Sequence, residues 1–273
     1  MLGQQLLARA PSAFEVVGRD LPEMDITEPD HVQREIEDIA PEVVIHLAAM
    51  TAVDVCETEV ESAFSVNGVG TGILAAACDR AGVALVYIST DYVFDGESDR
   101  PYVESDLVRP ISVYGRSKWW GEQATRERCP RHTILRTQWL YGPGGPNFVD
   151  TMLRLAREGK PLKVVDDQVG CPTSTFDLAD GIWEVVTREP GFGTYHLSAR
   201  GEVSWFGFAR EIFRLAGLAP ALEPCSTADF PRPAPRPRYG VLRNLHLELR
   251  GGDPMPAWEE GLARFLADPS RDA

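Results

Sequence analysis

The residues best suited to chemistry are a tyrosine and a lysine four positions apart, Tyr114 and Lys118, in the segment YGRSK. On a helix this spacing places both side chains on one face. A phenol with its reference pKa near ~10 exchanges protons poorly at neutral pH, but a neighbouring ammonium favours the phenolate and lowers that pKa. The pair therefore predicts a tyrosine that gives or takes a proton near neutrality.

The alternative, two surface side chains that stand four apart by chance, is weakened by the residues that precede the pair. The apolar run ALVYIST, residues 84–90, is typical of a buried strand, and it ends in Thr90, followed by Asp91. Catalytic groups of open α/β sheets gather at the carboxyl ends of strands. We expect the Thr90 hydroxyl and Tyr114 to face one carbonyl oxygen.

The elements that must position these residues alternate between apolar strands and helices. Strands are predicted over residues 14–20, 42–49, 84–90 and 132–139, and helices over residues 28–40, 61–82 and 113–128. Such alternation indicates a parallel sheet covered on both faces, and right-handed crossovers make it a doubly wound, Rossmann-type α/β fold.

The pattern changes after residue 142, where loops and shorter strands separate the remaining helices. We expect a dinucleotide-binding Rossmann domain over residues 1–142 and a smaller, partly interleaved C-terminal substrate-binding region over residues 143–273.

Composition excludes several classes of partner. A net charge of −14 argues against nucleic acid and anionic membranes as main partners. No apolar run approaches the ~20 residues of a membrane span. The five cysteines form no C-x-x-C pair and the histidines no ligand spacing, so we expect no metal, no disulfide framework, and reduced thiols in a cytoplasmic protein.

Three segments carry a resemblance to a known family. ISTDYVFDG at 88–96, YGRSK at 114–118 and DDQVGCPTST at 166–175 are similar, in this order, to motifs of the extended short-chain dehydrogenase/reductase superfamily. Within it they resemble the dTDP-4-dehydrorhamnose reductase family. The resemblance implies that NADPH or NADH passes a hydride to the C4 ketone of a dTDP-linked 6-deoxy-4-keto sugar, giving dTDP-L-rhamnose.

The resemblance also implies roles for individual residues. Tyr114 donates the proton to the developing alkoxide, Lys118 lowers the tyrosine pKa and holds the nicotinamide ribose, and Thr90 hydrogen-bonds the carbonyl oxygen of the sugar. Donors fixed in advance around one oxygen on which charge grows lower the barrier. Further substrate contacts are implied for Val53, Asp91, Tyr92 and Trp139.

The resemblance also implies contacts with the cofactor, at the start of the chain, after predicted strands and in the Tyr114–Lys118 pair. These residues are Met1, Leu2, Gly3, Arg19, Asp25, Ile26, Ala49, Met50, Thr51, Tyr114 and Lys118. Arg19 suits the 2′-phosphate of NADPH, whereas Asp20 beside it favours NADH, so both cofactors stay open.

The family begins with a strand and a glycine-rich turn that cradles the pyrophosphate, and only the tail of that turn, MLG, matches this sequence. We expect that the first strand and most of the glycine loop are missing, through a late start of the sequence, a trimmed chain or a real loss that weakens cofactor binding.

Two other functions stay open at this point. One is another nucleotide-sugar reductase or epimerase of the same superfamily. The other is a non-catalytic regulatory subunit resembling that of methionine adenosyltransferase, against which the intact Thr90, Tyr114 and Lys118 argue. The expected partners are a dTDP-sugar and, as an open option, a second copy of the chain in a homodimer.

Overall fold

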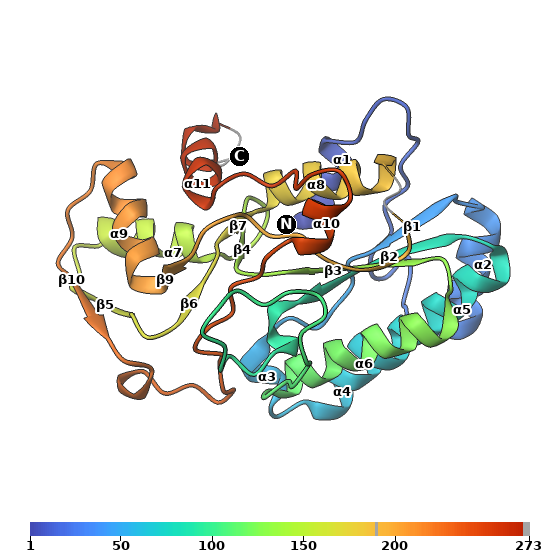
Figure 1. Cartoon of the computed structure of the whole chain (residues 1–273), viewed down its shortest axis with the longest axis horizontal. Coiled ribbons are helices and arrows are strands. Elements are labelled where there is room, and N and C mark those ends of the chain that lie inside the picture. Colours follow the sequence, from blue (N-terminus) through green and yellow to red (C-terminus); the bar gives the residue numbers. More distant parts are fainter. Residues whose placement is uncertain (189–190, 270–273) are drawn as a thin grey trace.

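The computed structural model describes residues 1–188 and 191–269, and a four-stranded parallel sheet organises it (Figure 1). The strands are β1 Val43–His46, β2 Ala84–Thr90, β3 His132–Thr137 and β8 Gly193–His196. They lie in the order β1-β2-β3-β8, and every neighbouring pair is parallel. Thr90 pairs with Thr137 in the register, so the ends of β2 and β3 lie side by side at the carboxyl edge of the sheet.

Helices cover both faces of this sheet. On one face lie α2 Pro29–Ile39, α5 Thr71–Ala81 and α6 Val113–Arg128, and on the other lie α1 Leu2–Ala8, α8 Thr175–Arg188 and α10 Leu245–Leu249 (Figure 1). Leu74 of α5 shares one core with Leu85 of β2, and Leu178 of α8 shares another with Ile88 of the same strand. The predicted doubly wound, Rossmann-type α/β fold is confirmed.

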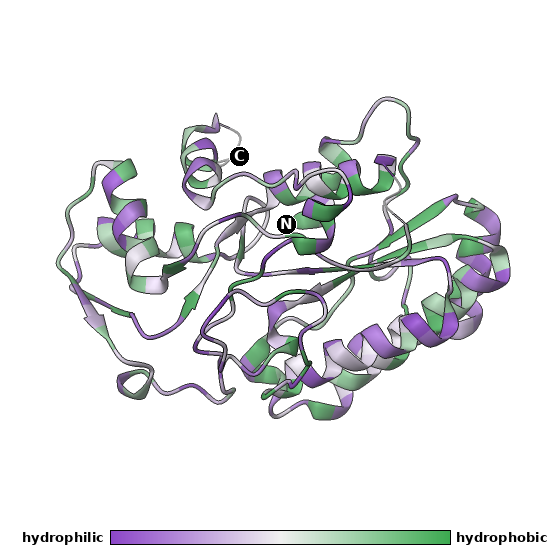
Figure 2. Cartoon of the chain, in the orientation of Figure 1, coloured by the Kyte–Doolittle hydropathy of each residue, from purple (hydrophilic) through white to green (hydrophobic). Residues whose placement is uncertain are grey.

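Hydropathy follows this layering. Figure 2 shows strands β1 and β2 mostly hydrophobic, whereas α2 and α6 carry hydrophilic residues along their length. Val83, Leu85 and Val86, around the start of β2, are at most 5% exposed, as expected for a strand covered on both sides. In the part of the chain that the structure describes, no helix is long and apolar enough to cross a membrane.

The helix predicted over residues 61–82 consists of three successive segments. They are α4 Val60–Phe64, the π-helical η1 Ser65–Gly70 and α5, which is capped by Gly82 in the left-handed conformation (φ 70°). Gly70, at the end of η1, packs closely on Ile26. A Cβ at this position would lie 2.9 Å from the Ile26 side chain, which is too close without a shift. Single π turns inside helices occur frequently at functional sites.

The strand predicted over residues 14–20 is wrong. This segment pairs with no strand among the described residues, and β1 pairs with β2 alone. A strand requires a neighbour that takes its backbone hydrogen bonds, and periodicity cannot supply one. The apolar residues of the segment are still used, because the Phe14 ring lies 5.3 Å from that of Trp183 on α8 and joins the core there. The apolar pattern therefore reflects packing and not strand pairing.

The remaining elements build a second core beside the sheet (Figure 1). They are β4 Leu140–Tyr141, α7 Phe148–Arg157, β5 Leu162–Val165, β6 Val169–Gly170, β7 Thr173–Ser174, β9 Val203–Ser204, α9 Trp205–Ala216, β10 Leu222–Cys225, η3 Thr227–Asp229 and α11 Trp258–Ala267. The strands pair two by two, as β10-β5, β4-β7 and β6-β9. The division into two domains at residue 142 stays a prediction. Two elements from the later part belong with the main sheet, because α8 packs on it and β8 is one of its four strands.

Candidate active site

Helix α6 carries Tyr114 and Lys118, and its start is fixed by a side chain. Ser112 is the N-cap, and its hydroxyl accepts a hydrogen bond from the Gly115 N–H at 3.1 Å. A Cβ at Gly115 would overlap the carbonyl oxygen of Tyr92, in the short helix η2 Asp91–Val93 that follows β2. The glycine of YGRSK therefore lets the start of α6 approach the end of β2 closely.

A second glycine of α6, Gly121, has a comparable role one turn beyond Lys118. A Cβ there would overlap the carbonyl oxygen of Asn67 in η1 and the phenol oxygen of Tyr87 in β2. Both neighbours are buried, with exposed fractions of 0%. The backbone of α6 thus touches the sheet and the π-helical segment directly.

We predict that Gly121→Ala destabilises the protein by about 1–3 kcal/mol, the usual cost of overpacking a close contact. The melting temperature, measured by circular dichroism, should fall by several degrees. Glu127→Ala is the matched control, because Glu127 lies on the same helix and is exposed. An unchanged melting temperature for Gly121→Ala would show that α6 does not need this approach.

Thr90, Asp91 and Tyr114 converge at the carboxyl end of β2. The Thr90 hydroxyl donates to Asp91 Oδ1 at 3.0 Å and caps η2 by accepting from the Tyr92 N–H at 3.2 Å. It also lies near enough to the Tyr114 phenol to lower the pKa of that group. The rings of Tyr92 and Tyr114 meet edge to face, with centroids 5.5 Å apart. Three groups able to contact one substrate oxygen therefore stand together, as the sequence predicts.

The pKa of Tyr114 differs from the expectation. Burial raises the pKa of Tyr114, the Thr90 hydrogen bond lowers it, and the charge of Asp91 raises it, with a net upward shift. The Lys118 ammonium, expected to lower this pKa, instead donates to the carbonyl oxygen of Ile88 at 2.7 Å and lies 4.2 Å from the centre of the Tyr87 ring. In this arrangement Tyr114 is a protonated phenol at neutral pH, the form that a proton donor requires.

Two buried groups at this edge titrate near neutrality. Burial lowers the pKa of Lys118 to about 7, with the charge of Glu122 opposing the shift. Burial raises the pKa of Asp91 to about 7, against hydrogen bonds that include the Thr90 hydroxyl. Lys118 is 3% exposed and Asp91 2%. Strongly shifted pKa values in buried groups are typical of functional sites.

Trp139 follows β3 at the same edge and has an unusual backbone. Its φ of 47° is left-handed, which is costly for a residue with a large side chain. Its ring stacks on that of Trp205, with centroids 3.5 Å apart and an interplanar angle of 8°. A Cβ at Gly170 would overlap this ring, so the glycine of DDQVGCPTST makes room for it. The strain is held in place by packing on both sides of the indole.

Val53, the other expected substrate contact, begins the short helix α3 Val53–Cys56. Its neighbour Asp54 binds Arg236 with both carboxylate oxygens, at 2.9 and 3.0 Å. Both charges act on the pKa of Tyr92, which burial raises. The start of α3 and the arginine-rich segment around 232–238 therefore lie near the catalytic edge.

The expected cofactor contacts fall into two groups. Ala49, Met50 and Thr51 follow β1 at the carboxyl edge, and Met50 belongs to the apolar cluster that includes Tyr114. Gly3 lies near this loop, because a Cβ there would be 3.4 Å from the Leu47 side chain. Met50 thus lies in the same cluster as Tyr114, and the role of this group in cofactor binding stays a prediction.

The second group is engaged elsewhere in this structure. Arg19, expected to meet a 2′-phosphate, forms an ion pair with Glu35 of α2 at 2.7 Å. The Asp25 carboxylate accepts two hydrogen bonds from Thr27, and Ile26 is 8% exposed. Leu2 packs into the core beneath α1, and the Met1 amino group lies 3.5 Å from the Gly144 carbonyl oxygen.

Sequence reasoning missed one residue that organises this edge, Asn67 of η1. Its side chain bonds both the N–H and the carbonyl oxygen of Met50, at 2.8 and 3.0 Å, and donates to the Ser117 hydroxyl at 2.9 Å. Asn67 thereby fixes the loop after β1 against α6. The only signal for it in the sequence is an Asn-Gly pair inside a predicted helix, where neither residue is favoured.

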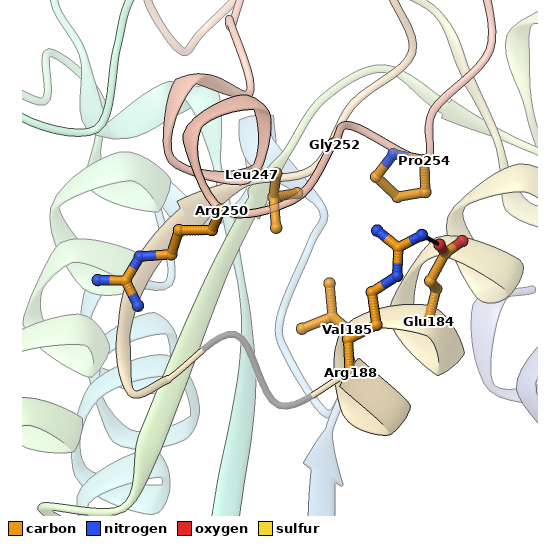
Figure 3. Close-up of a pocket in the computed structure, with 7 residues that line it drawn as sticks. All are labelled: Glu184, Val185, Arg188, Leu247, Arg250, Gly252 and Pro254. Atoms are coloured by element: carbon orange, nitrogen blue, oxygen red, sulfur yellow. Dashed lines mark ion pairs between the residues drawn. The ribbon is translucent and has the colours of Figure 1, made fainter.

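The pocket drawn in Figure 3 is a different place. Glu184, Val185 and Arg188 of α8 line it together with residues in and after α10, and none of the expected site residues does. Its volume of 10 Å³ holds about one water molecule. Among the described residues, no group of three His, Cys, Asp or Glu side chains has an arrangement that would hold a metal.

A doubly wound sheet, a Thr at the end of its central strand and a Tyr-x-x-x-Lys helix beside it define a short-chain dehydrogenase/reductase of the extended type. Within this class, the chain belongs to the RmlD substrate binding domain family, whose sequence model matches residues 1–270.

Named relatives span almost the whole chain. The dTDP-4-dehydrorhamnose reductase of Sinorhizobium fredii is 41% identical over 271 residues, which are 96% of this chain and 92% of the relative. The crystal structure of a dTDP-4-dehydrorhamnose reductase from Clostridium acetobutylicum is 45% identical, with a TM-score of 0.94 over 97% of this chain and 94% of its own. The Bacillus anthracis reductase in complex with NADP is 41% identical, also with a TM-score of 0.94, over 97% and 94% of the two chains.

Proposed function

We propose that this chain reduces dTDP-4-dehydrorhamnose to dTDP-L-rhamnose with NADPH or NADH. The observation that carries the proposal is the meeting of Thr90, Asp91 and Tyr114 at the end of β2, above the buried ammonium of Lys118. The named reductases that match over nearly the full chain support it. The named reductases do not favour an epimerase, and the intact Thr90, Tyr114 and Lys118 argue against a non-catalytic subunit.

The residues at this edge fit the nicotinamide end of a dinucleotide. A buried ammonium at this edge suits a ribose and a nicotinamide, and Asn67 fixes the loop after β1 against α6. Arg19, the residue expected to meet the 2′-phosphate of NADPH, is instead paired with Glu35. When bound, the cofactor supplies the hydride that reduces the C4 carbonyl.

The side chains of this chain supply the remainder of the reaction. As the new C–H bond forms, negative charge develops on the former carbonyl oxygen, and the Thr90 hydroxyl is placed to donate a hydrogen bond to it. The Tyr114 hydroxyl then gives its proton to this oxygen, which leaves a phenolate. The raised pKa of Tyr114 keeps the phenol protonated before the transfer. The family resemblance assigns stabilisation of this phenolate to Lys118, whose ammonium in this structure donates to the Ile88 carbonyl oxygen.

The stack of Trp139 on Trp205 gives a further prediction about the substrate site. Trp205→Ala should release the strained backbone of Trp139 and raise the KM for the dTDP-sugar by about tenfold, with a smaller change in kcat, because a lost positioning contact weakens binding. Parallel stacked indoles produce an exciton couplet in far-ultraviolet circular dichroism, which should disappear. Trp258→Phe, in the same core, is the control. Loss of the couplet with unaltered kinetics would remove the stack from the site.

The activity is tested by incubating the purified protein with dTDP-4-dehydrorhamnose and NADPH, and by following NADPH absorbance and the sugar products by chromatography. We expect one dTDP-L-rhamnose for each NADPH oxidised. An epimerised sugar with no net NADPH oxidation would favour an epimerase. No turnover of this sugar, together with co-purification of a synthetase, would favour a regulatory subunit.

A further inference from the structure

A carboxylate that the proposed reaction does not use lies beneath the catalytic residues. Glu122 stands four residues after Lys118 on α6 and has an exposed fraction of 0%. A buried carboxylate is costly unless hydrogen bonds and opposite charges compensate its lost hydration. Glu122 therefore requires an explanation from its neighbours.

Four donors surround this carboxylate. The Ser89 hydroxyl and Arg136 Nε donate to Oε1 at 2.7 and 2.8 Å, while Nη2 of Arg136 and Nη2 of Arg126 donate to Oε2 at 2.7 and 2.8 Å. Burial alone raises the pKa of Glu122, but Arg136, Arg126 and Ser89 lower it to about 2. Glu122 is consequently an anion at every pH at which the enzyme would work.

Three of these four donors come from the two strands that form the catalytic edge, and the Arg126 donor comes from α6 itself. Ser89 of β2 and Arg136 of β3 are paired in the sheet register, and the next pair along the strands is Thr90 with Thr137. Glu122 thus ties α6 to β2 and β3 one residue before the position where Thr90 meets Tyr114. A shift of α6 relative to the strands would move Tyr114 and Lys118 away from Thr90.

Glu122 also acts on Lys118 through its charge. The groups that face Lys118 are the Tyr87 ring and the Ile88 carbonyl of β2, His46 of β1, and Glu122 of α6. Burial, followed by the charge of Lys118, lowers the pKa of His46 to about 3, so this imidazole is neutral. Glu122 is the one acid that opposes the effect of burial on Lys118.

We infer that Glu122 is a positioning residue of the reductase site, which holds the Tyr114–Lys118 helix on β2 and β3 and maintains the positive charge of Lys118. The inference rests on the proposed function, because that function requires a charged Lys118. Its consequence can be measured without the reaction. Loss of the carboxylate charge should make Lys118 lose its proton at lower pH.

The sequence offers a direct measurement, since Lys118, Lys160 and Lys163 are its three lysines. Lys160 and Lys163 have side chains 69% and 70% exposed, so Lys160→Arg and Lys163→Arg leave one lysine without disturbing the core. With lysine labelled by ¹³C at Cε, the spectrum of this protein follows Lys118 alone. We expect Glu122→Gln to lower the Lys118 titration midpoint by about one pH unit or more, as removal of a nearby opposite charge does.

Turnover gives the second measurement. In Glu122→Gln, the pH above which kcat declines should fall by the same amount as the Lys118 midpoint. The variant should therefore be less active than the parent protein above neutral pH and regain part of that activity at lower pH. Arg126→Met is the matched control, because it removes another partner of Glu122 but leaves the carboxylate charge in place. Its Lys118 midpoint should stay near that of the parent protein.

Glu122→Gln leaves Arg136 buried without its counterion and can unfold the protein. The double variant Glu122→Gln/Arg136→Met removes both charges and retains most of the packing. If Glu122→Gln folds with the parent midpoint and pH profile, or the double variant folds with those of Arg136→Met, Glu122 is only structural and the inference is overturned. Failure of the parent protein to reduce the keto sugar would instead contradict the proposed function, with the lysine titration unaffected.

Discussion

Replacement of Tyr114 by phenylalanine is expected to lower kcat by about 10²–10⁴-fold, the usual contribution of a positioned proton donor. The substitution removes one hydroxyl from a half-buried ring whose edge contacts the Tyr92 ring, so the packing stays nearly intact. The melting temperature and the affinity for NADPH should therefore change little. Steady-state kinetics with the dTDP-sugar, thermal denaturation and a fluorescence titration with NADPH measure the three quantities.

Tyr92→Phe is the matched control for this experiment. It removes a hydroxyl from the ring that touches Tyr114, at a position expected to contact the substrate and not to donate the proton. We expect it to raise KM more than it lowers kcat, because it removes a binding contact. If Tyr114→Phe reduces the keto sugar within a few-fold of the parent rate, Tyr114 is not the acid.

The second large effect is expected for Lys118→Met, which should lower kcat by about 10²-fold or more, in the range found when one fixed donor is lost from a charged transition state. It should also weaken NADPH binding, because the proposed role of the ammonium includes holding the nicotinamide ribose. Methionine fills irregular gaps in cores, so the fold should survive. Since burial already destabilises the lysine charge, the melting temperature should not fall.

Lys160→Met, an exposed lysine in the same chain, controls for the loss of one positive charge. Isothermal titration with NADPH and steady-state kinetics on both variants separate the two roles of Lys118. If Lys118→Met changes neither NADPH affinity nor turnover, the Tyr114–Lys118 spacing is a coincidence.

The elements around the catalytic pair could be predicted because local signals agree with one another there. The helix predicted over residues 113–128 has the observed bounds, since Ser112 caps it and Gly115 and Gly121 fit a close approach. The strand at 84–90 is likewise correct, because a β-branched apolar run buried on both faces has few alternatives.

The strand prediction for residues 14–20 was wrong because the local signals and the pairing disagree there. Its apolar pattern suits a strand, but strand formation depends on a hydrogen-bonding neighbour that local sequence does not reveal. The side chains of this segment pack against α8 instead. The type of an element could therefore be predicted where an apolar segment both packs in a core and finds its hydrogen-bonding partners. It could not be predicted where an apolar segment packs without pairing.

In the site, the residue types could be predicted but some of their contacts could not. Thr90 and Tyr114 were expected to meet, and they do. The direction taken by the Lys118 ammonium depends on the Ile88 carbonyl, which only the register of α6 on β2 determines. Asn67 and Glu122 were missed as parts of the site because a single polar residue in a helix acquires its role from strands far away in the sequence.

The most direct test follows the hydride itself. The purified protein is given dTDP-4-dehydrorhamnose and NADPH deuterated at C4 of the nicotinamide, in both stereochemical forms, and the sugar product is examined by NMR. We expect one of the two forms to place a single deuterium at C4 of dTDP-L-rhamnose for each cofactor oxidised. A product without deuterium at C4 from either form, or a sugar recovered unchanged beside intact cofactor, would contradict the assignment of this chain as a reductase of the keto sugar.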